Sequence, residues 1–191
     1  MNDQSNLIKI QEPKVTVEYI EESLSRPDLN DLCDATIAAI EGGGGFGWVN
    51  APERDSLERY WQGVIAAPMR QLFVARLDNV ICGTTQLILP PHNNEAQAHM
   101  VQMTTNFVAP WARGHGLARM LLENVERKAR EMGYAVINLD VRETMGRAIA
   151  LYENMGYVRF GDHPLSVRVG DKTIASLYYY KNIAPSFFEK K

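Results

Sequence analysis

The amino-acid sequence predicts a single α/β domain. Residues 100–108 and 134–141 are rich in β-formers, and each run precedes a segment, 118–132 or 147–155, whose apolar side chains recur at helical spacing. The 191 residues, 46% hydrophobic and 23% charged, are enough for one substantial core and few for two domains. We expect the domain to span residues 14–182, after an N-terminal extension at 1–13 and before a C-terminal tail at 183–191.

The remaining segments fit this class. Six further runs have the composition or alternation of β-strands, at residues 14–20, 71–77, 80–89, 157–160, 166–169 and 174–181. Asp78-Asn79 separates two of these runs and predicts an antiparallel hairpin with a tight turn. Residues 29–40 and 57–65 carry two more helical patterns. In the helix after residue 117, Glu123/Arg127 and Glu126/Arg130 are i,i+4 pairs, which predict its solvent-exposed face.

Charge and composition argue against several classes of protein. The formal net charge of -3 and pI near 5.8 disfavour broad attraction to nucleic acid or to an anionic membrane. Cys33 and Cys82 are too few and too far apart to predict a disulfide framework or a cysteine zinc site, and we interpret them as buried thiols. No apolar run approaches the ~20 residues of a membrane span, and the first residues lack a signal-peptide pattern. We expect a cytoplasmic protein.

A glycine-containing loop is the strongest functional signal in the chain. It joins a β-like run to an amphipathic helix and consists of Arg113, Gly114, His115, Gly116, Leu117 and Ala118. The first N–H groups of a helix lack intrahelical partners and lie at the positive end of its dipole, so this junction predicts a bound diphosphate. Neither the Gly-Lys-Ser/Thr of a Walker loop nor the three-glycine dinucleotide fingerprint is present.

Two spaced motifs resemble the GNAT superfamily of acyl-CoA-dependent N-acyltransferases. The first is Val108-Ala109-Pro110 followed by Arg-x-x-Gly-x-Ala at residues 113–118, and the second runs from Ala148 through Tyr152 to Gly156-Tyr157. The resemblance covers roughly residues 14–182. It implies a mixed, mostly antiparallel sheet of about seven strands with helices on both faces.

The same resemblance implies acetyl-CoA as co-substrate. Acetyl-CoA would lie where the strands ending near Val108 and Val141 splay apart. The residues expected to contact it, besides the loop at 113–118, are Phe107, Val108, Thr144 and Ala148. Met145 stands where many members of the superfamily have Asn, so one amide contact is missing.

Tyr152 is the predicted general acid, since the family's tyrosine at this position protonates the departing thiolate. A phenol with a pKa of about 10 suits that role. An isolated tyrosine on an apolar helix face is more often a core residue. His99 and Asp140 are candidates for the general base, and for each a structural role is at least as common. No metal-ligand spacing joins the histidines to carboxylates, so we expect no catalytic metal.

The acceptor is less well specified. Glu41, Phe46 and Trp48 flank a glycine run expected to cover the acceptor site. Residues 41–61, together with residues 139–141, are loosely similar to tabtoxin-resistance acetyltransferases. This favours a small amine or an amino-acid-like acceptor. A catalytically silent acyl-CoA sensor and an enzyme acting on protein amines remain alternatives. Residues 177–180 with Phe187-Phe188 form either a homodimer contact or part of the protein's own core.

Overall fold

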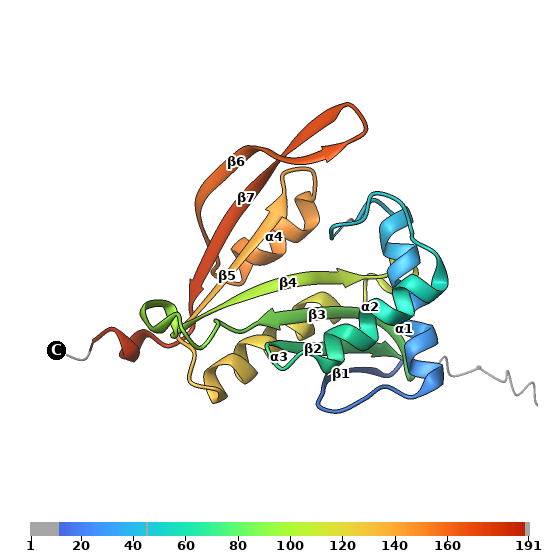
Figure 1. Cartoon of the computed structure of the whole chain (residues 1–191), viewed down its shortest axis with the longest axis horizontal. Coiled ribbons are helices and arrows are strands. Elements are labelled where there is room, and N and C mark those ends of the chain that lie inside the picture. The colour runs from blue at the N-terminus through green and yellow to red at the C-terminus, as the bar shows by residue number, and fades with distance from the viewer. Residues whose placement is uncertain (1–11, 45, 190–191) are drawn as a thin grey trace, which may run out of the picture.

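Seven strands form one mixed sheet in the computed structural model, which describes residues 12–44 and 46–189 (Figure 1). The strand order is β1-β2-β3-β4-β5-β7-β6. The elements along the chain are β1 (Val15–Ile20), α1 (Arg26–Glu41), α2 (Arg54–Ala66), β2 (Arg70–Leu77), β3 (Val80–Ile88), β4 (Met100–Val108), α3 (Leu117–Glu131), β5 (Val136–Arg142), α4 (Gly146–Asn154), β6 (Val158–Val169) and β7 (Lys172–Asn182). Most of the expected N-terminal extension, as well as Gly45 and Lys190-Lys191, lies outside the described residues.

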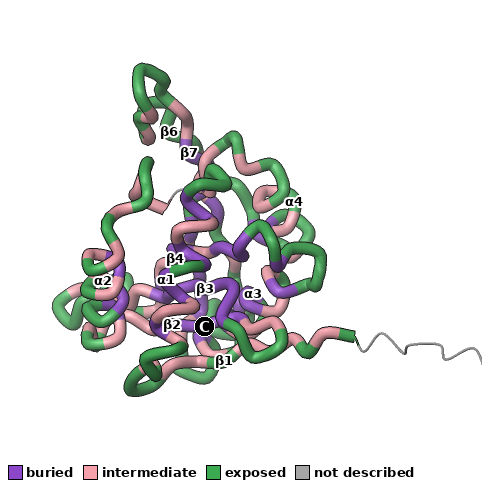
Figure 2. The backbone as a smooth tube through the Cα atoms, turned by 90° about the vertical axis from the view of Figure 1, so that its right-hand side faces the viewer, coloured by how far each residue is buried: buried purple, intermediate pink, exposed green. Residues whose placement is uncertain are grey.

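The sheet is mostly antiparallel, as expected, and β4 and β5 are its one parallel pair. Helices pack on both faces. On β2, Leu72 and Val74 join a core with α1 and α2, whereas Phe73 and Ala75 join a second core with α3 and α4. Figure 2 shows the buried chain concentrated along β2, β3 and β4, between α1 and α3. The expectation of helices on both faces is confirmed.

The hairpin predicted at Asp78-Asn79 is present, and both residues have positive φ, 49° and 70°, as a type I′ turn requires. The segments expected as separate strands at 157–160 and 166–169 are instead parts of one strand, β6. Its pairing with β7 is irregular between Arg159/Gly161 and between His163/Val167. These irregularities interrupt the alternation that would have shown one strand in the sequence.

The prediction that Glu126 lies on the exposed face of α3 was wrong. Glu126 is buried, and both of its carboxylate oxygens accept hydrogen bonds of 2.7 Å from Lys181 Nζ on β7. Arg130 is 3.8 Å away, so its contact is looser. Glu126 occupies the same helical stripe as Leu122 and Ala129, and its partner comes from a distant strand.

The two central strands diverge. β4 and β5 pair only from Met100–Gln102 to Val136–Asn138, although β4 continues to Val108 and β5 to Arg142. Beyond the pairing, β4 contains one extra residue relative to β3, because Thr84 faces Phe107 whereas Gln86 faces Thr104. Thr105 in this bulge has a φ of 54°. A bulge bends its strand, so β4 turns away from β5 and leaves a gap.

Gly83 on β3 lets the far end of β4 approach closely. A Cβ at Gly83 would lie 2.7 Å from the carbonyl oxygen of Phe107 and 3.2 Å from Cα of Val108. Backbone atoms cannot give way as a flexible side chain can, so any side chain at residue 83 must displace β4 at the edge of the gap.

Substitution G83A is therefore expected to lower the free energy of unfolding by about 1–3 kcal/mol. Gly63 provides a matched control, because it lies in α2 and a Cβ there would meet no atom within 4 Å beyond its own helix backbone. There G63A should raise stability by about 0.5–1 kcal/mol. Urea unfolding at 25 °C measures both, and an unchanged midpoint for G83A would show that β3 and β4 are not this close.

Candidate active site

A cavity of about 1130 Å³ occupies the gap between β4 and β5. Its walls are the C-terminal halves of these strands, the loop before α3, helix α4, the loop after α1 and the β6–β7 hairpin. Twelve of the residues predicted from the sequence line it: Phe46, Phe107, Val108, Arg113, Gly114, Gly116, Leu117, Ala118, Asp140, Thr144, Ala148 and Tyr152. The structure thus brings the glycine loop, the predicted acid and one predicted base into one space.

Four predicted site residues do not line the cavity. Glu41 is exposed at the end of α1, and His115 is exposed in the loop before α3. Trp48 packs edge-on against Phe46 at 5.9 Å and against Tyr60 at 4.8 Å, so it supports the cavity wall from behind. The fourth residue, His99, lies much farther away.

His99 precedes the first residue of β4, whereas the cavity begins at Met103 and extends beyond the end of that strand. At about 3.3 Å per residue, His99 is roughly 26 Å along the chain from Phe107. Its ring stacks on Phe187 at 5.6 Å, next to the C-terminal 3₁₀ turn. The structure does not bring His99 to the cavity, and Asp140 is the predicted base that remains there.

One end of the cavity has the features that favour an anion. Gly114 and Gly116 have φ of 92° and 75°, which favour glycine, and Gly116 is the N-cap of α3. Met120 N–H donates to Gly116 O at 3.1 Å, so the N–H groups of the three preceding residues lie before the first intrahelical bond. Arg113 Nε donates to Val108 O at 3.2 Å, and this contact fixes the guanidinium beside the loop.

The end of β4 supplies a backbone donor to the cavity. Ala109 N–H donates to Cys82 O at 2.7 Å, and the neighbouring residues Gly83 and Val108 face each other in the ladder. Hydrogen-bonded and non-hydrogen-bonded pairs alternate between antiparallel strands. The N–H of Val108 consequently points away from β3, toward the gap where β5 no longer pairs.

Tyr152 is buried on α4, and its hydroxyl oxygen accepts a hydrogen bond of 3.0 Å from Asn106 Nδ2. Because Asn106 uses the oxygen's lone pair, the hydroxyl hydrogen remains free to be donated. Burial raises the pKa of Tyr152; the Asn106 hydrogen bond lowers it in part, and the negative charge of Asp140 raises it further. The phenol is thus held in its protonated form at neutral pH.

Asn106 is a site residue that the sequence reasoning missed. It is the residue after the bulged Thr105, and its Oδ1 is buried without a hydrogen-bond partner among the described residues. The alternation of Gln102, Thr104 and Asn106 along β4 was the available signal, since a row of polar side chains in a central strand is unusual.

Asp140 lies on the polar face of β5 and contributes to the cavity wall. Partial burial raises the pKa of its carboxyl group, offset in part by a hydrogen bond from its own backbone. Four arginines and two serines of the lining were also not predicted: Arg119, Arg142, Arg147, Arg168, Ser166 and Ser176. The cavity therefore contains many more cationic than anionic side chains.

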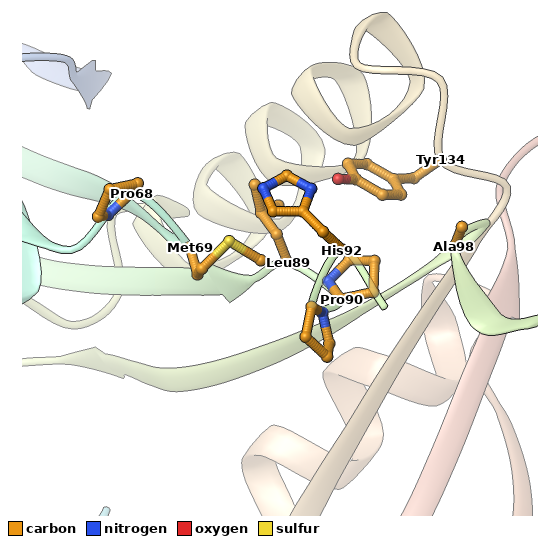
Figure 3. A pocket seen from close by; sticks show the side chains of 8 residues that line it. Pro68, Met69, Leu89, Pro90, His92, Ala98 and Tyr134 are labelled. Atoms are coloured by element: carbon orange, nitrogen blue, oxygen red, sulfur yellow. The ribbon is translucent and has the colours of Figure 1, made fainter. Parts of the chain in front are cut away.

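A second hollow, of about 380 Å³, lies at the opposite end of β4 (Figure 3). It is lined by Pro68, Met69, Leu89, Pro90, Pro91, His92, Ala98 and Tyr134. This lining offers one imidazole and one phenol and no charged side chain. The larger cavity, with convergent polar groups and perturbed pKa values, is the better candidate for a reaction site.

Within residues 12–44 and 46–189, no helix is long and apolar enough to cross a membrane. The same residues contain no group of three or more His, Cys, Asp or Glu side chains arranged to hold a metal ion.

A seven-stranded mixed sheet with helices on both faces and diverging central strands is typical of N-acetyltransferases of the GNAT fold. The model of the acetyltransferase (GNAT) family matches residues 37–157. The chain belongs to this family and is an N-acetyltransferase.

Relatives by sequence and by structure agree with this assignment. The chain is 59% identical over 133 residues to an uncharacterized N-acetyltransferase from the hisH-hisA intergenic region of Azospirillum brasilense, covering 70% of this chain and 79% of the relative. It is 28% identical over 109 residues to an IAA acetyltransferase of the same organism, covering 54% and 68%.

Among solved structures, yncA from Salmonella typhimurium with its cofactor acetyl-CoA superposes with a TM-score of 0.72 at 14% identity, covering 89% of this chain and 94% of that one. An N-acetyltransferase from Staphylococcus aureus Mu50 gives a TM-score of 0.74 at 16% identity, covering 90% and 99%. At these identities the structural comparisons establish the fold.

Substitution R113E is expected to weaken CoA binding by at least about tenfold, because it places a negative charge beside the expected diphosphate. The control R127E makes the same change on the exposed face of α3, where Arg127 pairs with Glu131 outside the cavity. Calorimetric titration with CoA measures both. Equal affinities for R113E and the native protein would reject the loop as the diphosphate site.

Proposed function

We propose that the protein transfers an acetyl group from acetyl-CoA to the primary amine of a small molecule, which attacks the thioester directly in a ternary complex. The observation that carries this proposal is the buried Tyr152 hydroxyl, held by Asn106 beside the gap between β4 and β5. A sensor that only binds acyl-CoA has no need of a proton donor held there.

The residues present suit a CoA thioester. The N-terminus of α3 and Arg113 offer N–H groups and positive charge to a diphosphate at one end of the cavity. The N–H of Val108 points into the gap and can stabilise the negative charge that develops on the acyl oxygen. Phe107, Thr144 and Ala148 complete the proposed contacts with the donor.

Asp140 is the proposed general base. Its carboxylate can receive the acceptor's ammonium group and take one proton from it, directly or through water. Because partial desolvation raises the pKa of Asp140 above its ordinary value, its carboxylate is a stronger base than that of an unperturbed aspartate. The group must be deprotonated to act, so activity is lost as the pH falls through this raised pKa.

Tyr152 is the proposed general acid. As the new N–C bond forms and the C–S bond breaks, the phenol gives its proton to the departing thiolate. The ammonium group loses one proton to Asp140 before the attack, and the nitrogen loses a second proton after the N–C bond has formed. The second proton replaces the one that Tyr152 gave to the thiolate, and Asp140 releases its proton to solvent, so each turnover of an ammonium acceptor releases one proton.

The loop after α1 favours a small acceptor. Phe46 stacks on Phe107 with 4.8 Å between ring centroids and 7° between ring planes. Trp48 and Tyr60 extend this aromatic contact onto α2. The loop is thereby held at the end of β4, where its residues form one wall of the cavity, and we infer that this wall limits the size of the acceptor.

Substitution Y152F is expected to lower kcat by about 10²-fold or more while leaving the Kd for CoA within about twofold. Substitution Y180F on β7 is the matched control, because Tyr180 is exposed and lies outside the cavity lining. A thiol-release assay measures kcat, and calorimetry measures Kd. Full activity of Y152F would remove Tyr152 as the acid.

The pH profile gives an independent readout. The rate of the native protein should fall at alkaline pH only above about 10, because burial raises the pKa of Tyr152 above its ordinary value. That alkaline limb should be absent from the residual activity of Y152F. Circular dichroism at each pH separates this titration from unfolding.

A further inference from the structure

The acceptor side of the cavity carries three polar groups on one face of the sheet. Asp140 and Arg142 are two residues apart on β5 and share a face, opposite to Leu139 and Val141 in the core. Ser176 on β7 lies directly across from Arg142 in the ladder. All three line the cavity.

None of these three side chains has a side-chain partner in the described part of the protein. Neither Asp140 nor Arg142 takes part in an ion pair there. Ser176 is 1% exposed, and its Oγ has no hydrogen-bond partner. A buried hydroxyl without a partner costs stability, so its presence in the wall of a cavity points to a ligand that completes it.

The charges at this face are of both signs. Arg142 supplies a planar guanidinium suited to a carboxylate, and Asp140 supplies a carboxylate suited to an ammonium group. Arg168 on β6 also lines the cavity and adds positive charge on the hairpin side. Figure 1 shows the β6–β7 hairpin and the loop after α1 at the end of the sheet toward which β4 and β5 run.

The distance between Asp140 and Arg142 along β5 suits a small molecule that carries both an ammonium group and a carboxylate. Side chains two residues apart on one strand face leave the backbone roughly 7 Å apart. Hydrogen bonds of about 2.9 Å at each end leave room for an amine and a carboxylate a few bonds apart. A purely cationic polyamine would instead place a second positive charge beside Arg142, which is unfavourable.

We propose that the acceptor is an α-amino acid whose carboxylate binds Arg142 and Ser176 while its amino group lies at Asp140, facing the gap between β4 and β5. This inference rests on the proposed acetyl transfer and names the substrate class of the same site. Arg142 and Ser176 then determine specificity, and Asp140 keeps its role in proton transfer.

The test uses the full-length protein, acetyl-CoA and thiol-release detection with matched acceptors. The panel contains the proteinogenic α-amino acids, the amines that correspond to them without the carboxylate, and a lysine-containing peptide. At least one amino acid should be acetylated, with kcat/KM at least about 100-fold above that of its decarboxylated counterpart, since a lost charged contact leaves Arg142 unpaired.

Variants at Arg142 and Ser176 test where the carboxylate of the acceptor binds. R142Q should raise KM for the amino acid about 10- to 100-fold with a smaller change in kcat, and R142K should recover part of this loss. S176A should raise the same KM a few-fold without lowering the melting temperature, because it deletes a hydroxyl that is unpartnered in the free protein. R159Q, on the exposed edge of β6, is the control and should leave both constants unchanged.

The outcomes separate the two proposals. Acetylation of amines or of the peptide as readily as of amino acids would overturn the amino-acid assignment and leave acetyl transfer to amines standing. An unchanged KM in R142Q, with an amino acid as substrate, would also overturn the proposed role of Arg142. Tight CoA binding without turnover on any acceptor would overturn the proposed function, and this inference with it.

Discussion

The short pairing between β4 and β5 is the constraint on which the rest of this structure depends. The two strands form a parallel ladder over Met100–Gln102 and Val136–Asn138, and then they separate. The bulge at Thr105 bends β4, and Gly83 lets β3 hold the bent strand closely. Without this divergence, backbone hydrogen bonds would fill the space that the cavity occupies.

The divergence also distributes chemical roles between the two sides of the sheet. On the side of α3 and α4, the helix N-terminus and Arg113 form the proposed site for a diphosphate. On the opposite side, Asp140 and Arg142 face the space beneath the loop after α1. Asn106, in the bent part of β4, reaches across the gap to Tyr152. The proposed proton donor is thus placed where the two sides meet.

Sequence reasoning found what is encoded locally. The glycine loop at 113–118, the turn at Asp78-Asn79 and the helix bearing Tyr152 each depend on neighbours a few residues away, and their motifs are visible in the sequence. Contacts between distant segments were missed, because register and bulges decide them. Glu126 meets Lys181 from β7, and Asn106 is aimed by an unpredicted bulge. His99 adjoins β4 as expected, but the sequence does not indicate that the cavity lies toward the other end of this strand.

The central claim is that the gap between β4 and β5 is the acyl-donor site. Backbone amide NMR of the isotope-labelled protein, titrated with CoA, tests it most directly. We expect the largest shifts at Val108, at Leu117 to Arg119 and along the unpaired end of β5, with little change at Tyr134. Shifts centred on the hollow between Pro68 and Tyr134, with Val108 and α3 unperturbed, would contradict it.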